Sequence, residues 1–119
     1  MYEDKDSKYF NNPRTDLIGL IPNKENNKIL EIGSGGGDTL IEIKRLGLAK
    51  EVVGIDVTDL PNSNQNSAEI DKLLICDIED VQLNFQENYF DVIICGDVLE
   101  HLIDPLSVLR KLHLYLKQD

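Results

Sequence analysis

A short apolar segment that runs directly into a glycine-rich turn constrains the fold of this chain most. Residues 28–32 read Lys-Ile-Leu-Glu-Ile, and four of the next five residues, 33–37, are glycine. Residues 38–46 then repeat apolar side chains at helical spacing, and Gly47 is the expected C-cap. This order predicts a strand, a tight turn and a helix, the unit from which parallel α/β sheets are built.

Three further strand candidates follow, at 52–55, 72–76 and 89–95. Each of them ends at, or one or two residues short of, an acidic residue: Asp56, Asp77 and Asp97. Apolar strands that alternate with helices and loops indicate a parallel α/β sheet. Because ligands of such sheets bind beyond the carboxyl ends of the strands, we expect a site that combines the glycine turn with several carboxylates.

Two Asx-Pro pairs predict helix starts. Asn12-Pro13 is expected to open a short helix that ends near Pro22, and Asp104-Pro105 a second one. The second helix is expected to pack through one leucine stripe: Leu106, Leu109, Leu112 and Leu116. Residues 1–12 are expected to be a flexible lead-in to a single domain over 13–119.

The charge balance narrows the class of partner. The chain has 119 residues, of which 12 are Lys or Arg and 22 are Asp or Glu, so its net charge is −10. This disfavours nucleic acid and an anionic membrane surface, but not a cationic small molecule. The polar N-terminus lacks a signal-peptide pattern, no apolar run is long enough to cross a bilayer, and the two cysteines form no disulfide framework or zinc motif. We therefore expect a cytoplasmic protein without a metal site.

The glycine turn allows two interpretations. A dinucleotide fingerprint, G-x-G-x-x-G/A, needs a small sixth residue, and here that residue is Asp38. A carboxylate at a helix N-terminus would repel a pyrophosphate. The turn fits G-x-G-x-G better, which favours a nucleoside without a pyrophosphate over NAD.

The three strand-end carboxylates have both ligand-binding and structural interpretations. Asp56 lies 19 residues after Gly37 (56 − 37), where a carboxylate can accept hydrogen bonds from a ribose diol; the alternative is a loop or N-cap aspartate. Asp77 would recognise an adenine edge or begin a loop. Asp97 would contact a ligand or stabilise a local turn.

Three segments together resemble a class I S-adenosylmethionine-dependent methyltransferase: 29–37 (ILEIGSGGG), 53–56 (VGID) and 90–105 (FDVIICGDVLEHLIDP). The last is similar to the segment after strand four in type 11/12 methyltransferases. Residues 14–22 (RTDLIGLIP) also resemble methyltransferase domains found beside glycosyltransferases in bacterial surface-polysaccharide clusters. The resemblance implies a Rossmann-like, doubly wound parallel sheet with strand order 3-2-1-4.

The resemblance also implies a set of cofactor-binding residues for S-adenosylmethionine and its product S-adenosylhomocysteine. Those expected around the methionine part are Glu31, Gly33, Ser34, Gly35, Gly37, Gly96 and Asp97. Those expected around the ribose and adenine are Asp56, Val57, Asp77 and Ile78. An acidic site suits this cofactor, which carries a sulfonium and an ammonium group.

Methyl transfer needs mainly alignment, because the sulfonium is already activated. A general base helps when the acceptor is a hydroxyl, and His101 is the candidate; the alternative is a surface or capping histidine. His113 is expected to pack or face solvent. The implied strand order separates Cys76 from Cys95 by three strand spacings, about 14 Å, which predicts two free thiols.

The chain departs from the family where it stops, after residues 116–119. The fifth strand and the elements beyond it are expected to be missing, which would leave strand four as an apolar edge. This predicts self-association through that edge, a partner chain or a marginal fold. Three functions stay open: a methyltransferase for a small molecule or sugar, a non-catalytic cofactor-binding fragment that needs a partner, and a nicotinamide-dependent oxidoreductase, which Asp38 disfavours.

Overall fold

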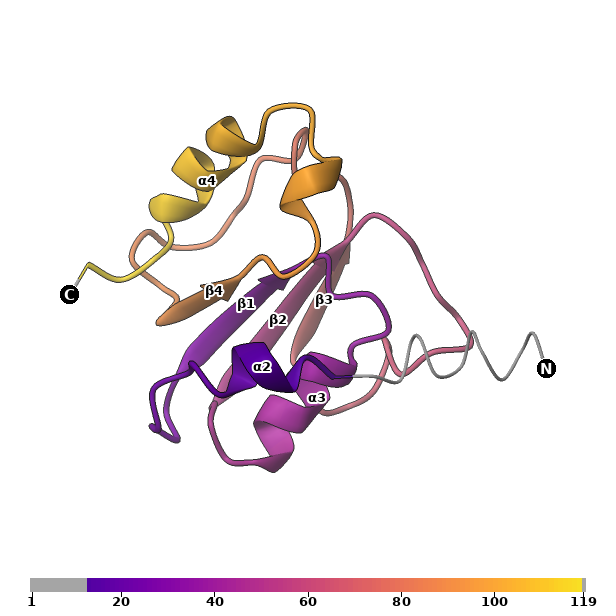
Figure 1. The fold of residues 1–119 in the computed structure, drawn as a ribbon, viewed down its shortest axis with the longest axis vertical. Helices are drawn as coiled ribbons and strands as arrows, with labels where there is room; N and C mark the ends of the chain where they lie inside the picture. Colours follow the sequence, from indigo (N-terminus) through magenta and orange to yellow (C-terminus); the bar gives the residue numbers. More distant parts are fainter. Residues whose placement is uncertain (1–12, 119) are drawn as a thin grey trace.

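The fold is a four-stranded parallel sheet in the order β3-β2-β1-β4 (Figure 1). A computed structural model describes residues 13–118, so the predicted lead-in, 1–12, lies outside the described residues. The strands are β1 (Lys28–Ile32), β2 (Glu51–Asp56), β3 (Lys72–Ile75) and β4 (Val92–Ile94). The predicted strand order and direction are therefore confirmed.

Helices cover both faces of the sheet (Figure 1). One face packs against α2 (Thr15–Ile18) and α3 (Asp38–Arg45), and the other packs against α4 (Pro105–His113). A short 3-10 helix, η1 (Leu99–His101), links β4 to α4. Within the described residues no helix has both the length and the hydrophobicity needed to cross a bilayer.

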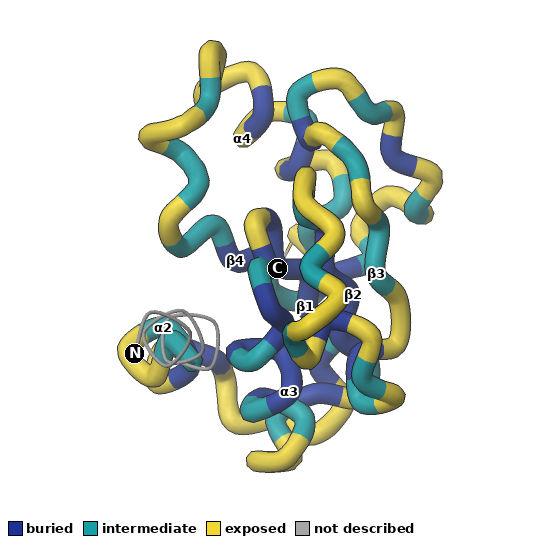
Figure 2. Tube along the Cα trace, turned by 90° about the vertical axis from the view of Figure 1, so that its right-hand side faces the viewer, coloured by how far each residue is buried: buried dark blue, intermediate teal, exposed yellow. Residues whose placement is uncertain are grey.

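Strand β1 is one of the two inner strands of the sheet and is buried on both sides (Figure 2). Ile29 packs into the cluster on the α3 side, whereas Leu30 and Ile32 pack into the cluster on the α4 side. Two buried faces require apolar residues at successive positions, which explains why β1 and β2 read as nearly continuous apolar runs. Glu31 is the buried polar residue in β1.

Two predicted boundaries were wrong. Helix α2 begins at Thr15, with Arg14 as its N-cap residue. Strand β4 covers 92–94 rather than 89–95, because Tyr89 and Phe90 pair with the backbone that follows α4: both N–H groups donate to Tyr115 O, at 3.0 and 2.8 Å.

The start of α4 was predicted correctly, and its buried face was predicted only in part. Asp104 Oδ1 accepts a hydrogen bond from Ser107 N at 3.1 Å, so Asp104 caps the helix as expected. The buried positions of α4 are Val108 and Leu112, whereas Leu106 and Leu109 are exposed. At 100° per residue, Leu112 lies at the border of the leucine stripe, and the packed face is centred nearer Val108.

The outer side of β4 is partly covered. Phe90 and Leu116 form a parallel bridge, and Lys117 N donates to Phe90 O at 2.8 Å. The predicted apolar edge is therefore covered next to Phe90, and self-association through the rest of β4 stays a prediction. Cys76 and Cys95 are free, and burial raises the pKa of both thiols.

Candidate functional site

The turn between β1 and α3 forms the centre of the site. Gly33, Gly35 and Gly37 all have positive φ angles, of 74°, 55° and 88°. Gly37 is the N-cap residue of α3, and a Cβ atom there would lie 2.5 Å from Ile70 Cδ1. The turn thus needs glycine at this position for its backbone conformation, and a larger residue would also displace the end of the Ile70 side chain.

Asp56 lies against this turn at the end of β2. Its Oδ2 accepts a hydrogen bond from Gly35 N at 2.6 Å, and its Oδ1 accepts one from Thr58 N at 2.9 Å. Each carboxylate oxygen has a second lone pair, so both oxygens can still accept a hydrogen bond from a ligand. The structure brings Asp56 and the glycine turn together as expected, while binding of a ribose stays a prediction.

Glu31 and Ser34 contribute buried oxygen atoms that lack hydrogen-bond partners, among the residues described: Glu31 Oε1 and Ser34 Oγ. Glu31 pairs with Gly54 of β2 and Ile94 of β4 in the sheet. A Cβ atom on Gly54 would lie 2.6 Å from Ser34 Oγ, so Gly54 makes room for the serine. Burial, and then the charge of Asp56, raise the pKa of Glu31 to about 8. Unpartnered buried oxygens next to a glycine turn fit a polar ligand.

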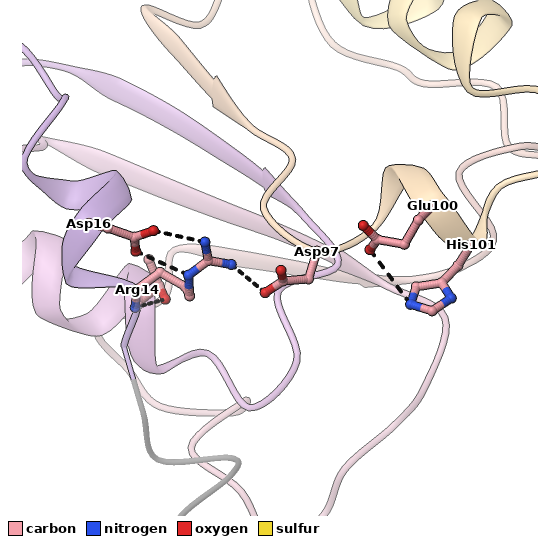
Figure 3. Close-up of polar contacts among 6 residues, drawn as sticks. Arg14, Asp16, Asp97, Glu100 and His101 are labelled. Atoms are coloured by element: carbon pink, nitrogen blue, oxygen red, sulfur yellow. Dashed lines mark hydrogen bonds and ion pairs between the residues drawn. The ribbon is translucent and has the colours of Figure 1, made fainter.

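Arg14 joins the site from the N-terminal segment (Figure 3). Its guanidinium forms ion pairs with Asp97, after β4, and with Asp16 at 2.9 Å. A Cβ atom on Gly96 would lie 3.1 Å from Arg14 Nη1, so the guanidinium lies over the Gly96 backbone. Its hydrogen bonds to Asp16 and Asp97 raise the pKa of Arg14 further above its ordinary value. Arg14 lies at the N-terminus of α2 and at no strand end, so the pattern of strand-end residues does not indicate it.

Asp77 and Ile78 begin the loop after β3. Asp77 Oδ1 accepts a hydrogen bond from Glu79 N at 2.9 Å, and the Ile78 side chain is buried in the core on the α4 side. Lys111 of α4 donates to Ile78 O at 2.6 Å and to Val81 O at 2.8 Å. The loop is therefore held by the helix, and Asp77 stabilises the start of the loop, while its recognition of an adenine edge stays a prediction. Val57, also expected in the site, is exposed.

His101 lies on η1, apart from the Arg14–Asp97 pair (Figure 3). Its side chain is 76% exposed, and Nε2 lies 3.6 Å from Glu100 Oε1. The imidazole is therefore accessible, and its role as a general base stays a prediction. His113 is exposed on α4, as expected. Among residues 13–118, no three His, Cys, Asp or Glu side chains form a group that could hold a metal ion.

The family model and two curated relatives that match this chain are named as methyltransferases. The family model described as a methyltransferase domain matches residues 30–119. Ubiquinone biosynthesis O-methyltransferase from Actinobacillus pleuropneumoniae serotype 5b (strain L20) is 35% identical over 100 residues, which cover 77% of this chain and 42% of that protein. The enzyme of the same name from Haemophilus ducreyi is 33% identical over 118 residues, covering 92% and 48%. The chain thus spans less than half the length of these curated relatives.

Solved structures show the same fold. A putative methyltransferase from Bacillus halodurans C-125 superimposes with a TM-score of 0.72 at 21% identity, covering 87% of this chain and 46% of that one. Phosphoethanolamine N-methyltransferase 1 from Haemonchus contortus, in complex with phosphoethanolamine and S-adenosylhomocysteine, superimposes with a TM-score of 0.75 at 21% identity, covering 97% and 25%. The four strands of this chain therefore have the fold seen in these proteins.

Proposed function

This chain belongs to the methyltransferase domain family, and from that membership we propose that it binds S-adenosylmethionine and carries the cofactor-binding part of a methyltransferase. The proposed acceptor is a hydroxyl group of a small molecule, because the matching relatives are named O-methyltransferases. A sugar hydroxyl is one such acceptor. A net charge of −10 supports neither DNA nor RNA as the substrate.

The observation that carries this proposal is the set of unfilled polar positions around the glycine turn. Glu31 Oε1 and Ser34 Oγ are buried without partners, and Asp56 keeps a lone pair on each oxygen. The cofactor has an ammonium group, a ribose diol and a carboxylate. Glu31 would hold the ammonium, Asp56 the diol, and the Arg14 guanidinium the carboxylate. The buried Ile78 would contribute apolar contact for the adenine.

The bound cofactor supplies an activated methyl group, so the work of the chain is to bind and align. Glycines at 33, 35 and 37 let the backbone approach the ligand closely. The Arg14–Asp97 ion pair joins the N-terminal segment to the end of β4 and would fix the methionine end. His101 is accessible and would accept the proton of a hydroxyl acceptor.

A second candidate is a cofactor-binding unit that has no turnover without another chain. The relatives described above are longer than this chain, which spans 42% and 48% of their lengths, so methyl transfer by this chain alone is a separate proposal. Both candidates require the same cofactor site, and they differ in whether the chain alone transfers a methyl group.

Calorimetric titration of the chain with S-adenosylhomocysteine, with NAD as the control, tests the proposed site. Binding of S-adenosylhomocysteine alone would support it. Absence of binding for both ligands, in a sample whose circular dichroism shows a folded α/β protein, would contradict it. Methyl transfer from S-adenosylmethionine to a panel of phenols and sugars would then separate the two candidates.

Asp56→Ala should weaken binding of S-adenosylhomocysteine by about 1.5–3 kcal/mol, the range for hydrogen bonds to a charged group. The substitution removes the proposed ribose acceptor and the partner of Gly35 N. Asp59→Ala is the matched control, because it removes the same charge from an exposed position three residues later. Equal losses in the two variants would contradict the role of Asp56.

Arg14→Gln should weaken binding of S-adenosylhomocysteine roughly tenfold, because it removes the cation proposed to hold the carboxylate. It should leave the affinity for 5′-methylthioadenosine unchanged, since that nucleoside has no carboxylate. Arg110→Gln, at an exposed position of α4, is the control for lost charge. A similar loss for both ligands would show that Arg14 acts elsewhere.

A further inference from the structure

Gln65 is a buried amide in the long connection between β2 and β3. Gln65 is only 1% exposed, and its side chain makes three hydrogen bonds, all to backbone groups. Oε1 accepts from Leu60 N at 2.8 Å, and Nε2 donates to Thr58 O at 2.9 Å and to Gly35 O at 3.1 Å. The last bond joins positions 30 residues apart, so Gln65 links this connection to the glycine turn.

The Gly35 residue is consequently held from two sides. Its N–H donates to Asp56 Oδ2 at 2.6 Å, and its carbonyl accepts from Gln65 Nε2. A Cβ atom built on Gly35 would have no other atom within 4 Å, so packing does not fix the residue on that side. With φ at +55° and open space where a Cβ atom would lie, Gly35 depends on these two side-chain hydrogen bonds for its conformation.

The connection also packs directly on the next part of the turn. A Cβ atom on Gly37 would lie 2.5 Å from Ile70 Cδ1, 3.4 Å from Asn64 O and 3.5 Å from Gln65 Cα. Thr58 N donates to Asp56 Oδ1, and Thr58 O, the carbonyl of the same residue, accepts from Gln65 Nε2. Gln65 thus contacts the backbone on both sides of the Asp56 carboxylate.

We propose that Gln65 is a positioning residue for the cofactor site: by holding Gly35 O and Thr58 O, it directs Gly35 N and Thr58 N toward Asp56 and fixes the carboxylate for its ligand. This inference rests on the proposed function, because the ligand used to test it is S-adenosylhomocysteine. Gln65 itself is buried beneath these groups and acts through Asp56. Because the turn is already ordered before binding, less conformational entropy is lost when the ligand binds.

Gln65→Glu is the sharpest variant, because it keeps the size of the side chain and the acceptor for Leu60 N while it removes both donors. Titration at pH 8 should show S-adenosylhomocysteine binding weakened roughly 5- to 30-fold, the loss expected for one or two hydrogen bonds. Asn66→Asp adds the same negative charge at the adjacent, exposed position and should leave the affinity within about twofold of wild type. Equal affinity for wild type and Gln65→Glu would overturn the inference.

A double-mutant cycle separates positioning from a general effect on folding. Gln65→Met and Asp56→Asn act on the same Gly35 residue, so their combined loss of affinity should be smaller than the product of the two single losses. If the double variant loses affinity by the product of the two single losses, the positioning role is wrong. If Gln65→Glu fails to fold because of its buried charge, the neutral Gln65→Met variant and this cycle decide the question.

The two proposals fail in different ways. If the wild-type chain binds no S-adenosylhomocysteine, the proposed function is wrong and this inference with it. If the wild type binds and the Gln65 variants bind equally well, only the inference is wrong.

Discussion

Replacing Glu31 with glutamine should remove a loss of stability that the wild-type chain shows as the pH rises from about 4.5 to about 8. Burial between neighbouring strands raises the pKa of Glu31 from its ordinary value of 4.5 to about 8, with a further contribution from Asp56. The folded chain therefore keeps the Glu31 proton over a range in which the unfolded chain releases it.

The sign follows from proton binding. Between these pH values the folded state holds more protons than the unfolded state, so the free energy of unfolding falls as pH rises. The contribution of Glu31 is complete below about pH 4.5 and lost above about pH 8. At 1.36 kcal/mol per unit, the loss is roughly 3–5 kcal/mol, a large share of the stability of a small domain.

Urea unfolding of wild type and Glu31→Gln at several pH values would measure this effect. The curve of the variant should be flatter between pH 5 and 8, and the variant should be the more stable protein at pH 8. Glu87→Gln removes a carboxylate from an exposed position and should follow the wild-type curve. If Glu31→Gln has the wild-type dependence on pH, Glu31 is charged in the folded chain.

His101→Ala should slow methyl transfer to a hydroxyl acceptor roughly 10²- to 10⁴-fold, the usual contribution of a positioned general base. The affinity for S-adenosylhomocysteine should not change, because His101 lies on η1, apart from Arg14 and Asp97. The exposed imidazole has only Glu100 as its described partner in an ion pair, at 3.6 Å, and can reorient toward an acceptor.

Initial rates on the best acceptor from the panel, together with calorimetric affinities, would test the role of His101. His113→Ala is the control, since it removes an exposed histidine from α4. An unchanged rate in His101→Ala would identify His101 as a surface residue. A reduced rate accompanied by weaker cofactor binding would show that the substitution disturbs the site as a whole.

The architecture could be predicted wherever local sequence and burial agree. Strand β1 has the predicted bounds because a charged residue precedes its apolar run and the glycine turn ends it. The β4 boundary was wrong because Tyr89 and Phe90 pair with the backbone of residues after α4, a contact that no local pattern reports. The packed face of α4 was predicted only in part for a similar reason: leucines at helical spacing do not show which of two apolar faces meets the sheet.

The candidate site could be predicted in part. Asp56 and the glycine turn were found because both lie at strand ends, where parallel sheets bind ligands. Gln65 was part of a polar segment with no periodicity, and its burial depends on the path of a connection that has no helix or strand. Arg14 precedes a four-residue helix, and only the tertiary fold brings it over Gly96. The acidity of the expected site was one signal that a compensating cation should be present.

The pairing of β1 with two strands from very different parts of the chain has a kinetic consequence. Lys28 pairs with Glu51 across 23 residues (51 − 28), whereas Ile29 pairs with Val92 across 63 (92 − 29). Closing the longer loop costs about 0.9 kcal/mol more in chain entropy, so the β1–β2 pair should form earlier during folding. The β1–β2 pair brings together Glu31, the glycine turn and Asp56. The later pairing of β4 with β1 then adds Gly96 and Asp97 to the site.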